Sequence, residues 1–314
     1  MKRINPEAAA LRAMSQRLHR RAYRVAGPNS LWHLDGNHKL IRWRIVIHGG
    51  IDGYSRLVVF LRASDNNRSA TVMDSFLDAV AKYGVHSRVR TDHVCLMMNV
   101  FRGFHRGSAL RGRSTHNQRI ERLWGDLWRG VSNVYYDLFN FLESEGIIDI
   151  DNEMHMWALH YVYLPRINHD LRGFLDQWNN HGLRTERHQI PIQLFVQGCL
   201  ERQDQTTSAM QSLFGGGQGD AQEEPEREGR ADAGDVALVW PERVTVPPNQ
   251  HLLSDEDMEQ LTTQFDPLAG RRGDIGLDTI HNVISYIEAL PQVDCLAALQ
   301  PILRTHTLSW LDAG

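Results

Sequence analysis

The segment from residue 114 to residue 124, STHNQRIERLW, constrains the fold of this chain more than any other stretch. Ser114 or Thr115 can cap the start of a helix, because a hydroxyl oxygen accepts a hydrogen bond from an unbonded backbone N–H. Apolar residues then recur at helical spacing at Ile120, Leu123, Leu127 and Val131. The segment therefore predicts a helix that buries one stripe in a core.

A second stripe runs beside the apolar one on the same predicted helix, through Asn117, Glu121, Trp124 and Trp128. Asn117 and Glu121 are one turn apart on one side of the helix. A carboxylate at the edge of a core, with an amide one turn before it, suits a metal ligand. The alternative is an ordinary amphipathic helix with one solvated glutamate, and spacing alone favours that alternative.

The chain upstream of this helix alternates strand and helix patterns. Strands are expected at 31–37, 44–51, 57–63 and 88–92, with a tight turn at 52–56. Residues 69–83 have apolar side chains at helical spacing, and Gly84 is expected to end that helix. Three hairpin-like strands, a helix and a further strand predict an α/β core with a mixed sheet. Asp35 lies near the end of the first strand and Asp92 at the end of the fourth.

Four short motifs in this order resemble the integrase cores of retroviruses, retrotransposons and related transposons: 32–35 (WHLD), 52–56 (DGYSR), 90–93 (RTDH) and 117–122 (NQRIER). The sequences of these motifs are most similar to those of integrase-core proteins of animal genomes that descend from transposable elements. The resemblance covers residues 31–128 and extends through helices to about residue 200. It implies a ribonuclease-H-like α/β fold, in which a mixed sheet is flanked by helices.

The resemblance also implies a site and a reaction. Asp35, Asp92 and Glu121 would hold two Mg²⁺ ions, or Mn²⁺ in their place, since hard divalent ions prefer carboxylate oxygens. Such a pair of ions supports nicking of DNA at a 3′ end and transfer of that end into a target strand. Asn117 is expected to support the site or to contact DNA. His116, Arg119 and Arg122 are expected to reach phosphates.

One departure from the family pattern affects the expected activity. Between Asp92 and Glu121 there are 121 − 92 − 1 = 28 residues, fewer than the family usually has. The segment is therefore expected to lack a helix and a strand beside the site, which would impair catalysis. Two explanations are open, a domesticated sequence and a misplaced exon boundary. The alternatives to an impaired, DNA-binding protein are an active strand-transferase and a non-enzymatic protein-interaction module on the same fold.

Charge is distributed unevenly along the chain. Residues 1–200 carry 27 Lys and Arg against 18 Asp and Glu, a balance of +9, and the remainder carries 7 against 20, or −13, which gives −4 in total. A basic body suits a phosphate backbone such as that of DNA, the expected partner, but an arginine-rich surface that is merely solvated is equally compatible with this charge alone. We expect a homo-oligomer, a protein partner for the acidic C-terminal tail, and a nuclear location inferred from the function, with the cytoplasm as the alternative.

Composition divides the chain into five expected parts. They are a basic helical arm at 1–28, the integrase-like core at 29–131, a helical extension at 132–202, an acidic and Gly-rich linker at 203–250, and a small helical or poorly ordered tail at 251–314. No run of eighteen apolar residues is present, so no membrane span is expected. The three cysteines lie far apart, which fits neither a disulfide framework nor a zinc site.

Overall fold

A computed structural model describes residues 25–91, 109–111, 117–214, 246–251, 253–270 and 272–290. Residues 1–24 of the predicted basic arm, Asp92 and His116 lie outside these ranges, as do most of the acidic linker and the last 24 residues of the chain. Within the described ranges, no helix combines the length and the apolar character that a membrane crossing requires.

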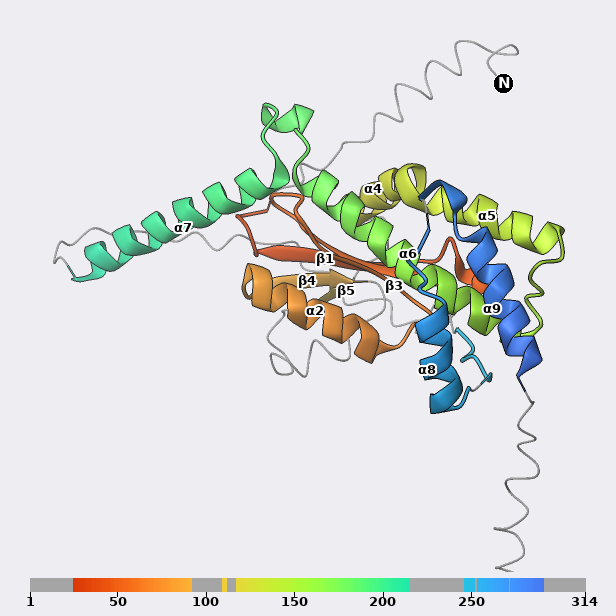
Figure 1. Ribbon diagram of the computed structural model, residues 1–314. Coiled ribbons are helices and arrows are strands. Elements are labelled where there is room, and N and C mark those ends of the chain that lie inside the picture. The colour runs from red at the N-terminus through yellow and green to blue at the C-terminus, as the bar shows by residue number, and fades with distance from the viewer. Residues whose placement is uncertain are drawn as a thin grey trace, which may run out of the picture.

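The described strands form one mixed sheet in the order β3-β2-β1-β4-β5 (Figure 1). Antiparallel pairing joins β1 to β2 and β2 to β3, whereas β1, β4 and β5 run parallel. A three-stranded meander followed by parallel strands on its far side is the ribonuclease-H-like arrangement that the resemblance implied. The strand bounds are Leu31–Asn37 for β1, Val46–Asp52 for β2, Val58–Ser64 for β3, Arg88–Thr91 for β4 and Ala109–Arg111 for β5.

Helices cover both faces of the sheet (Figure 1). Alternate residues of a strand point to opposite faces, and on β1 this separates Trp32 and Leu34 from His33 and Asp35. Trp32 and Leu34 pack with α2 and the start of α7, while α4, α5, α6 and α9 bury the apolar residues of the other face. The helices are α2 Ser69–Tyr83, α4 Gln118–Leu127, α5 Asn133–Ser144, α6 Glu153–Asn179, α7 Pro191–Phe214, α8 Asp255–Gln264 and α9 Leu277–Ala289.

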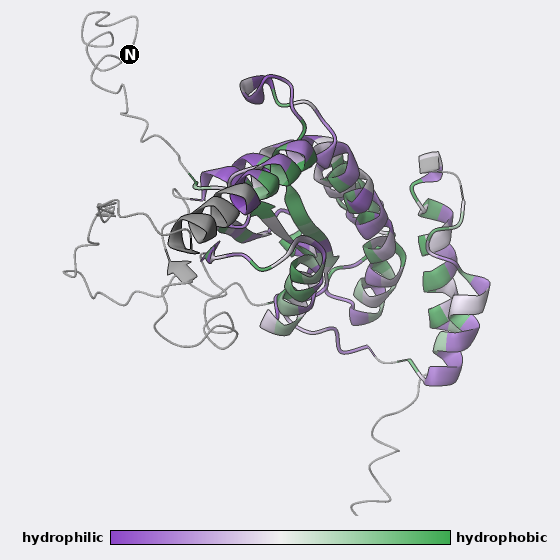
Figure 2. Cartoon of the chain, turned by 90° about the vertical axis from the view of Figure 1, so that its left-hand side faces the viewer, coloured by the Kyte–Doolittle hydropathy of each residue, from purple (hydrophilic) through white to green (hydrophobic). Residues whose placement is uncertain are grey.

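Hydropathy follows this layering, with apolar residues gathered on the sheet and on the inner sides of the helices (Figure 2). The predicted buried stripe of Ile120, Leu123, Leu127 and Val131 is confirmed, because all four side chains are buried against the sheet and α6. Burial of each such side chain contributes on the order of 1.5–3 kcal/mol relative to exposure. This stripe fixes the rotation of α4 about its axis.

Most predicted elements are found, with differences at their ends. The α2 helix has the predicted bounds, and Gly84 follows it at φ 89°, a conformation that favours glycine. The second strand begins at Val46 rather than at residue 44. A 3₁₀ turn, η1, occupies Ile41–Trp43, and Arg44 ends it in the left-handed region at φ 57°, where its side chain pairs with Glu153. Arg44 therefore belongs to a corner and not to the strand.

The strand expected to be missing after Asp92 is present. Residues Ala109–Arg111 form β5, which pairs parallel with β4 through Val89↔Ala109 and Thr91↔Arg111. The expected loss of a strand beside the site is therefore wrong. The residues between β4 and β5 lie outside the described ranges.

The predicted boundary at residue 131 falls inside continuous helix. A π-helical turn at Trp128–Ser132, η3, joins α4 directly to α5. The predicted cap at Ser114 or Thr115 also differs from the structure, because Asn117 is the N-cap residue and the helix begins at Gln118. Asn117 makes no side-chain capping bond there, since its amide is used elsewhere.

The end of the body and the tail also differ from expectation. Helix α7 continues to Phe214, past the predicted linker start at 203. The tail helices belong to the main core, because α9 buries Ile280, Val283, Ile284 and Ile287 in the same cluster as α6, and α8 adds Leu261. Ser254 caps α8, with its hydroxyl accepting from the Asp257 N–H at 3.1 Å.

Candidate active site

Two side chains fasten α4 to β1 at the edge of the sheet. The Asn117 Oδ1 lies 2.5 Å from His33 Nδ1, and its Nδ2 donates to the Leu34 carbonyl at 3.2 Å. Since the amide oxygen can only accept, the proton between them belongs to His33 Nδ1. Two turns further along the helix, Trp124 Nε1 donates to Asp35 Oδ2 at 2.8 Å. We call these contacts the α4–β1 latch.

Glu121 lies on the same helical stripe, between the two ends of the latch. It follows Asn117 by four residues and precedes Trp124 by three, spacings that share one helix face. Along the axis its Cα is therefore about 4.5 Å from that of the residue that bonds Asp35. Its side chain is exposed. The contacts of α4 therefore bring the part of the helix that carries Glu121 onto β1, the strand that carries Asp35.

Asp35 is held by one oxygen and remains partly exposed. The indole of Trp124 reaches it by crossing β2 at Gly49, which has no side chain to block the ring. A Cβ on Gly49 would lie 2.6 Å from Trp124 Cη2 and 2.9 Å from Leu61 Cδ2. Distances this short exclude a larger residue unless the ring moves. The hydrogen bond from Trp124 to Asp35 therefore depends on the glycine at position 49.

His33 is buried and uncharged at neutral pH. Burial lowers its pKa from 6.5 to about 4, against the raising effect of its bond to Asn117, and the charges of Arg90 and Arg119 lower it further. Arg90 lies on β4, directly beside His33 in the parallel register, and Arg119 lies on the first turn of α4. The positive charge around this buried contact thus comes from the two arginines and not from the histidine.

The remaining predicted site residues divide into three groups. Asp92 and His116 lie outside the described residues, although β4 ends at Thr91, directly before Asp92. Arg122 is exposed beside Glu121, and Arg119 is half-buried. Asn117 has no exposed surface, so its burial argues against contact with DNA, and its bonds instead support the site.

The carboxylates of Asp35 and Glu121 provide oxygen ligands of the kind that Mg²⁺ and Mn²⁺ prefer. Among the described residues alone, no group of three His, Cys, Asp or Glu is close enough to hold a metal ion.

Sequence reasoning placed Trp124 on the correct stripe without assigning its bond to Asp35, and it did not identify His33 as the partner of Asn117. The signal available was the spacing of Asn117, Glu121 and Trp124 on one face.

Asp52 was predicted from the sequence only as part of a turn. The Asp52 carboxylate is buried, which raises its pKa, and it accepts bonds from the N–H groups of Asn29, Tyr54 and Ser55 and from the Ser55 hydroxyl. These bonds make it a structural residue that holds the β2–β3 turn.

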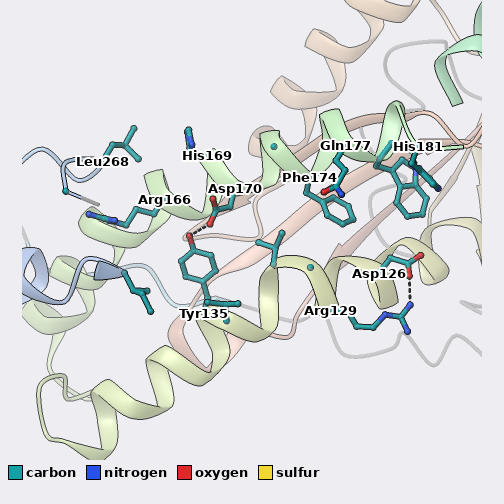
Figure 3. Close-up of a pocket in the computed structure, with 17 residues that line it drawn as sticks. Asp126, Arg129, Tyr135, Arg166, His169, Asp170, Phe174, Gln177, His181 and Leu268 are labelled. Carbon is teal, nitrogen blue, oxygen red and sulfur yellow. Dashed lines mark hydrogen bonds and ion pairs between the residues drawn. The ribbon is translucent and has the colours of Figure 1, made fainter. Parts of the chain in front are cut away.

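A large groove lies elsewhere, between α6 and the helix that runs from α4 into α5 (Figure 3). Its volume is about 1020 Å³. Two carboxylates line it and both are bonded, Asp126 to Arg129 and Asp170 to the Tyr135 hydroxyl. Asp126 is five residues from Glu121, which places the two on different sides of α4. The groove is therefore separate from the Asp35–Glu121 edge.

Comparison with known proteins assigns the sequence to a family. No protein of curated function matches the sequence. Two solved structures are similar with TM-scores of 0.37: the HTLV-2 integrase catalytic core domain in complex with magnesium, at 15% identity, and a simian T-cell lymphotropic virus intasome in complex with the PP2A regulatory subunit B56 gamma, at 18% identity. Each alignment covers 55% of this chain, with 99% of the first protein's chain and 56% of the second's. The family model for the integrase core domain matches residues 22–209. This chain therefore belongs to the integrase core domain family.

Proposed function

We propose that this protein binds DNA and catalyses metal-dependent nicking and strand transfer at Asp35, Asp92 and Glu121. The observation that carries the proposal is the α4–β1 latch, which brings the glutamate-bearing helix onto the aspartate-bearing strand. The latch has contacts on both sides of Glu121 and bonds Asp35 itself. An ordinary amphipathic helix needs only its apolar stripe and no such polar contacts.

The position of β4 supports Asp92 as the third ligand. This strand runs parallel to β1, and its paired residues include His33 and Arg90. The paired residues His33 and Arg90 are 57 positions apart in the sequence (90 − 33 = 57). Asp35 and Asp92 have the same separation (92 − 35 = 57). Carboxyl ends of parallel strands meet at one edge of a sheet, and Asp35 lies near that end of β1 while Asp92 comes directly after β4 in the sequence.

The donor set fits hard divalent ions. Asp35 is partly exposed, with one carboxylate oxygen oriented by the Trp124 indole, and Glu121 is exposed, so both residues offer carboxylate oxygens at the surface. When bound, two such ions activate the attacking oxygen and stabilise the leaving oxygen of a phosphodiester. Arg119 and Arg122 lie on the same turn of α4 as Glu121, where their charges favour a phosphate backbone.

A second candidate function is DNA binding with impaired catalysis. The observation in its favour is the short spacing of 28 residues between Asp92 and Glu121. The presence of β5 weakens this argument, because part of that spacing is used for a strand in the expected place. A transposon-derived, domesticated origin agrees with this second candidate. A protein-interaction module on the same fold would need no DNA contact at all.

The test measures nicking of supercoiled plasmid and joining of a labelled duplex in Mn²⁺, with the full chain. We expect activity from the unchanged protein and background signal from Glu121→Gln and from Asp35→Asn. Glu145→Gln removes an exposed charge directly after α5 instead and should leave activity unchanged. Equal signals from Glu121→Gln and the unchanged protein would contradict the proposed site.

DNA binding is measured separately by fluorescence anisotropy at increasing salt. Contacts with phosphates predict that the logarithm of the affinity falls linearly with the logarithm of the salt concentration. Salt-dependent binding without catalysis would favour the impaired protein over the active one. Absence of binding at low salt would exclude both and leave the interaction module.

A further inference from the structure

The helix α7 projects from the body (Figure 1), and it carries a row of exposed apolar side chains. Ile192, Val196 and Leu200 are 39%, 51% and 57% exposed. They follow one another at intervals of four residues, so they form one row about 12 Å long. Three large apolar side chains in one row on a projecting helix are typical of an interaction surface.

The opposite side of α7 is fixed against the body, so the row cannot turn inward. Phe195 is buried with the α2 side of the core, and Arg202 donates to the Pro28 carbonyl at 3.3 Å. Gly198 lets the helix approach closely, because a Cβ there would lie 2.7 Å from Pro28 Cδ and 2.8 Å from Tyr54 Cε1. These contacts hold the helix in one rotation and keep the row outside.

We propose that this row binds the same row of a second copy of the chain, with the two α7 helices antiparallel about a two-fold axis at Val196. In this arrangement Val196 meets its own copy, and Ile192 of each chain faces Leu200 of the other. A two-fold interface uses the same patch twice, so the patch must be complementary to itself.

The polar residues beside the row meet that requirement. Gln189, Gln193 and Gln197 flank it, and neutral amides both donate and accept, so they can face their own copies without repulsion. Gln189 Nε2 already donates to Gln197 Oε1 at 3.1 Å along the helix. A charged flank would repel itself across the axis.

Charge selects the antiparallel direction. Glu201 follows the row, while Arg187 and His188 precede the helix, whose N-terminus also carries a partial positive charge. Antiparallel pairing brings Glu201 of each copy toward the basic end of the other, whereas parallel pairing would bring the two Glu201 carboxylates together. Because the row is short, the interface is of the small, transient class, and the dimer should dissociate on dilution.

Sedimentation equilibrium of the full chain, from about 1 to about 100 μM, tests the proposal. We expect a monomer–dimer equilibrium that Val196→Glu shifts at least about tenfold toward monomer. Phe141→Glu is the matched control, since it places the same charge at an exposed apolar site, 46% accessible, on α5. A protein that is monomeric over the whole range, or a dimer that Val196→Glu leaves unchanged, would overturn the proposal. The first result would mean that the row is covered by the chain itself or by a different protein.

Cysteine cross-linking tests the direction of pairing independently of DNA binding and catalysis. With the three native cysteines changed to serine, Val196→Cys should give a cross-linked dimer with a short bismaleimide. Leu200→Cys should give far less, because the two copies of that residue lie on opposite sides of the axis. Equal cross-linking of the two variants would indicate parallel helices and contradict the antiparallel arrangement.

Discussion

At the residue scale, the presentation of Asp35 depends on an indole from a different element. The Trp124 side chain is only 8% exposed, and its Nε1 donates a hydrogen bond to Asp35 Oδ2 at 2.8 Å. A bond to a charged group is stronger than one between neutral groups, because the charge attracts the donor dipole. Trp124 therefore both packs against the sheet and orients a carboxylate.

Replacing Trp124 with phenylalanine keeps most of the packing and removes this bond. We expect a loss of about 1–3 kcal/mol in the free energy of unfolding, measured in urea. The rise in melting temperature on adding MnCl₂ should also be smaller than in the unchanged protein. Trp128→Phe is the control, one turn along the same helix, and should not change the response to Mn²⁺. An undiminished Mn²⁺ response in Trp124→Phe would argue against orientation of Asp35 by the indole.

His160 gives a prediction about acid stability. It is buried in α6, its Nε2 lies 2.8 Å from the Trp43 carbonyl, and burial lowers its pKa below 6.5. The unfolded chain therefore takes up a proton at a higher pH than the folded chain does. Stability should fall as the pH drops below about 6.5, where the unfolded state binds more protons.

The comparison is made with His160→Gln, whose unfolding free energy should fall less between pH 7 and pH 5 than that of the unchanged protein. His188→Gln removes an exposed histidine and should leave the pH dependence as it was. If His160→Gln loses stability with the same slope, another group is responsible.

At the scale of elements, the α4–β1 latch joins two segments that are distant in sequence. Asn117 satisfies His33 Nδ1 and the Leu34 carbonyl, and all of these groups are buried. An amide is suited to this place because it offers one acceptor and one donor side by side. The site therefore depends on a polar contact inside the fold as well as on its acidic residues.

Asn117→Ala removes the hydrogen-bond partner of two buried groups, the His33 Nδ1–H and the Leu34 carbonyl. We expect a loss of about 2–3 kcal/mol of stability, because unsatisfied buried polar groups keep their desolvation cost. Gln118→Ala changes the next, exposed residue of α4 and should cost far less. Chemical denaturation of the two variants side by side measures the difference. Similar losses in the two variants would contradict the latch.

Gly49 tests the fit of Trp124 across β2. Gly49→Ala places a methyl group 2.6 Å from the indole, so the ring must move, and we expect destabilisation of about 1–3 kcal/mol together with a change in tryptophan fluorescence. The matched control is Gly36→Ala on β1, where the nearest atom to the new Cβ is at 3.5 Å. A stable Gly49→Ala protein with unchanged fluorescence would show that the ring has room to adjust.

At the scale of the whole molecule, the tail helices are part of the body. Ile280, Val283 and Ile287 of α9 are buried in the cluster that contains α6. Removing α9 would expose an apolar face of α6.

Ile280→Ala should accordingly destabilise the entire protein by about 2–5 kcal/mol, the usual cost of a cavity in a core. The measurement is a thermal unfolding curve followed by tryptophan fluorescence, which reports on the body. Thr279→Ala, at the neighbouring and less buried position, is the control. An unchanged body transition in Ile280→Ala would mean that the tail unfolds as a separate unit.

Much of this fold was predictable because its elements have local signals. The α2 helix was bounded correctly by apolar spacing and by Gly84, and the α4 stripe by the spacing of Ile120 and Leu123. Contacts between distant segments have no such signal. The pairing of β5 with β4, the bond from Trp124 to Asp35 and the burial of α9 each depend on residues far apart in sequence, which spacing along one segment cannot reveal.

The edge strand β3 is closed by two asparagines of α6. Asn168 bonds both the N–H and the carbonyl of Ala63, at 2.9 and 3.0 Å, and Asn179 does the same for Val58, at 2.8 and 3.0 Å. Eleven residues of helix and five of strand both span about 16.5 Å, so the two amides match the strand at both places. An open edge would invite a strand from another molecule and lead to aggregation. In this protein a helix takes the place of that neighbour, so the sheet cannot grow on this side.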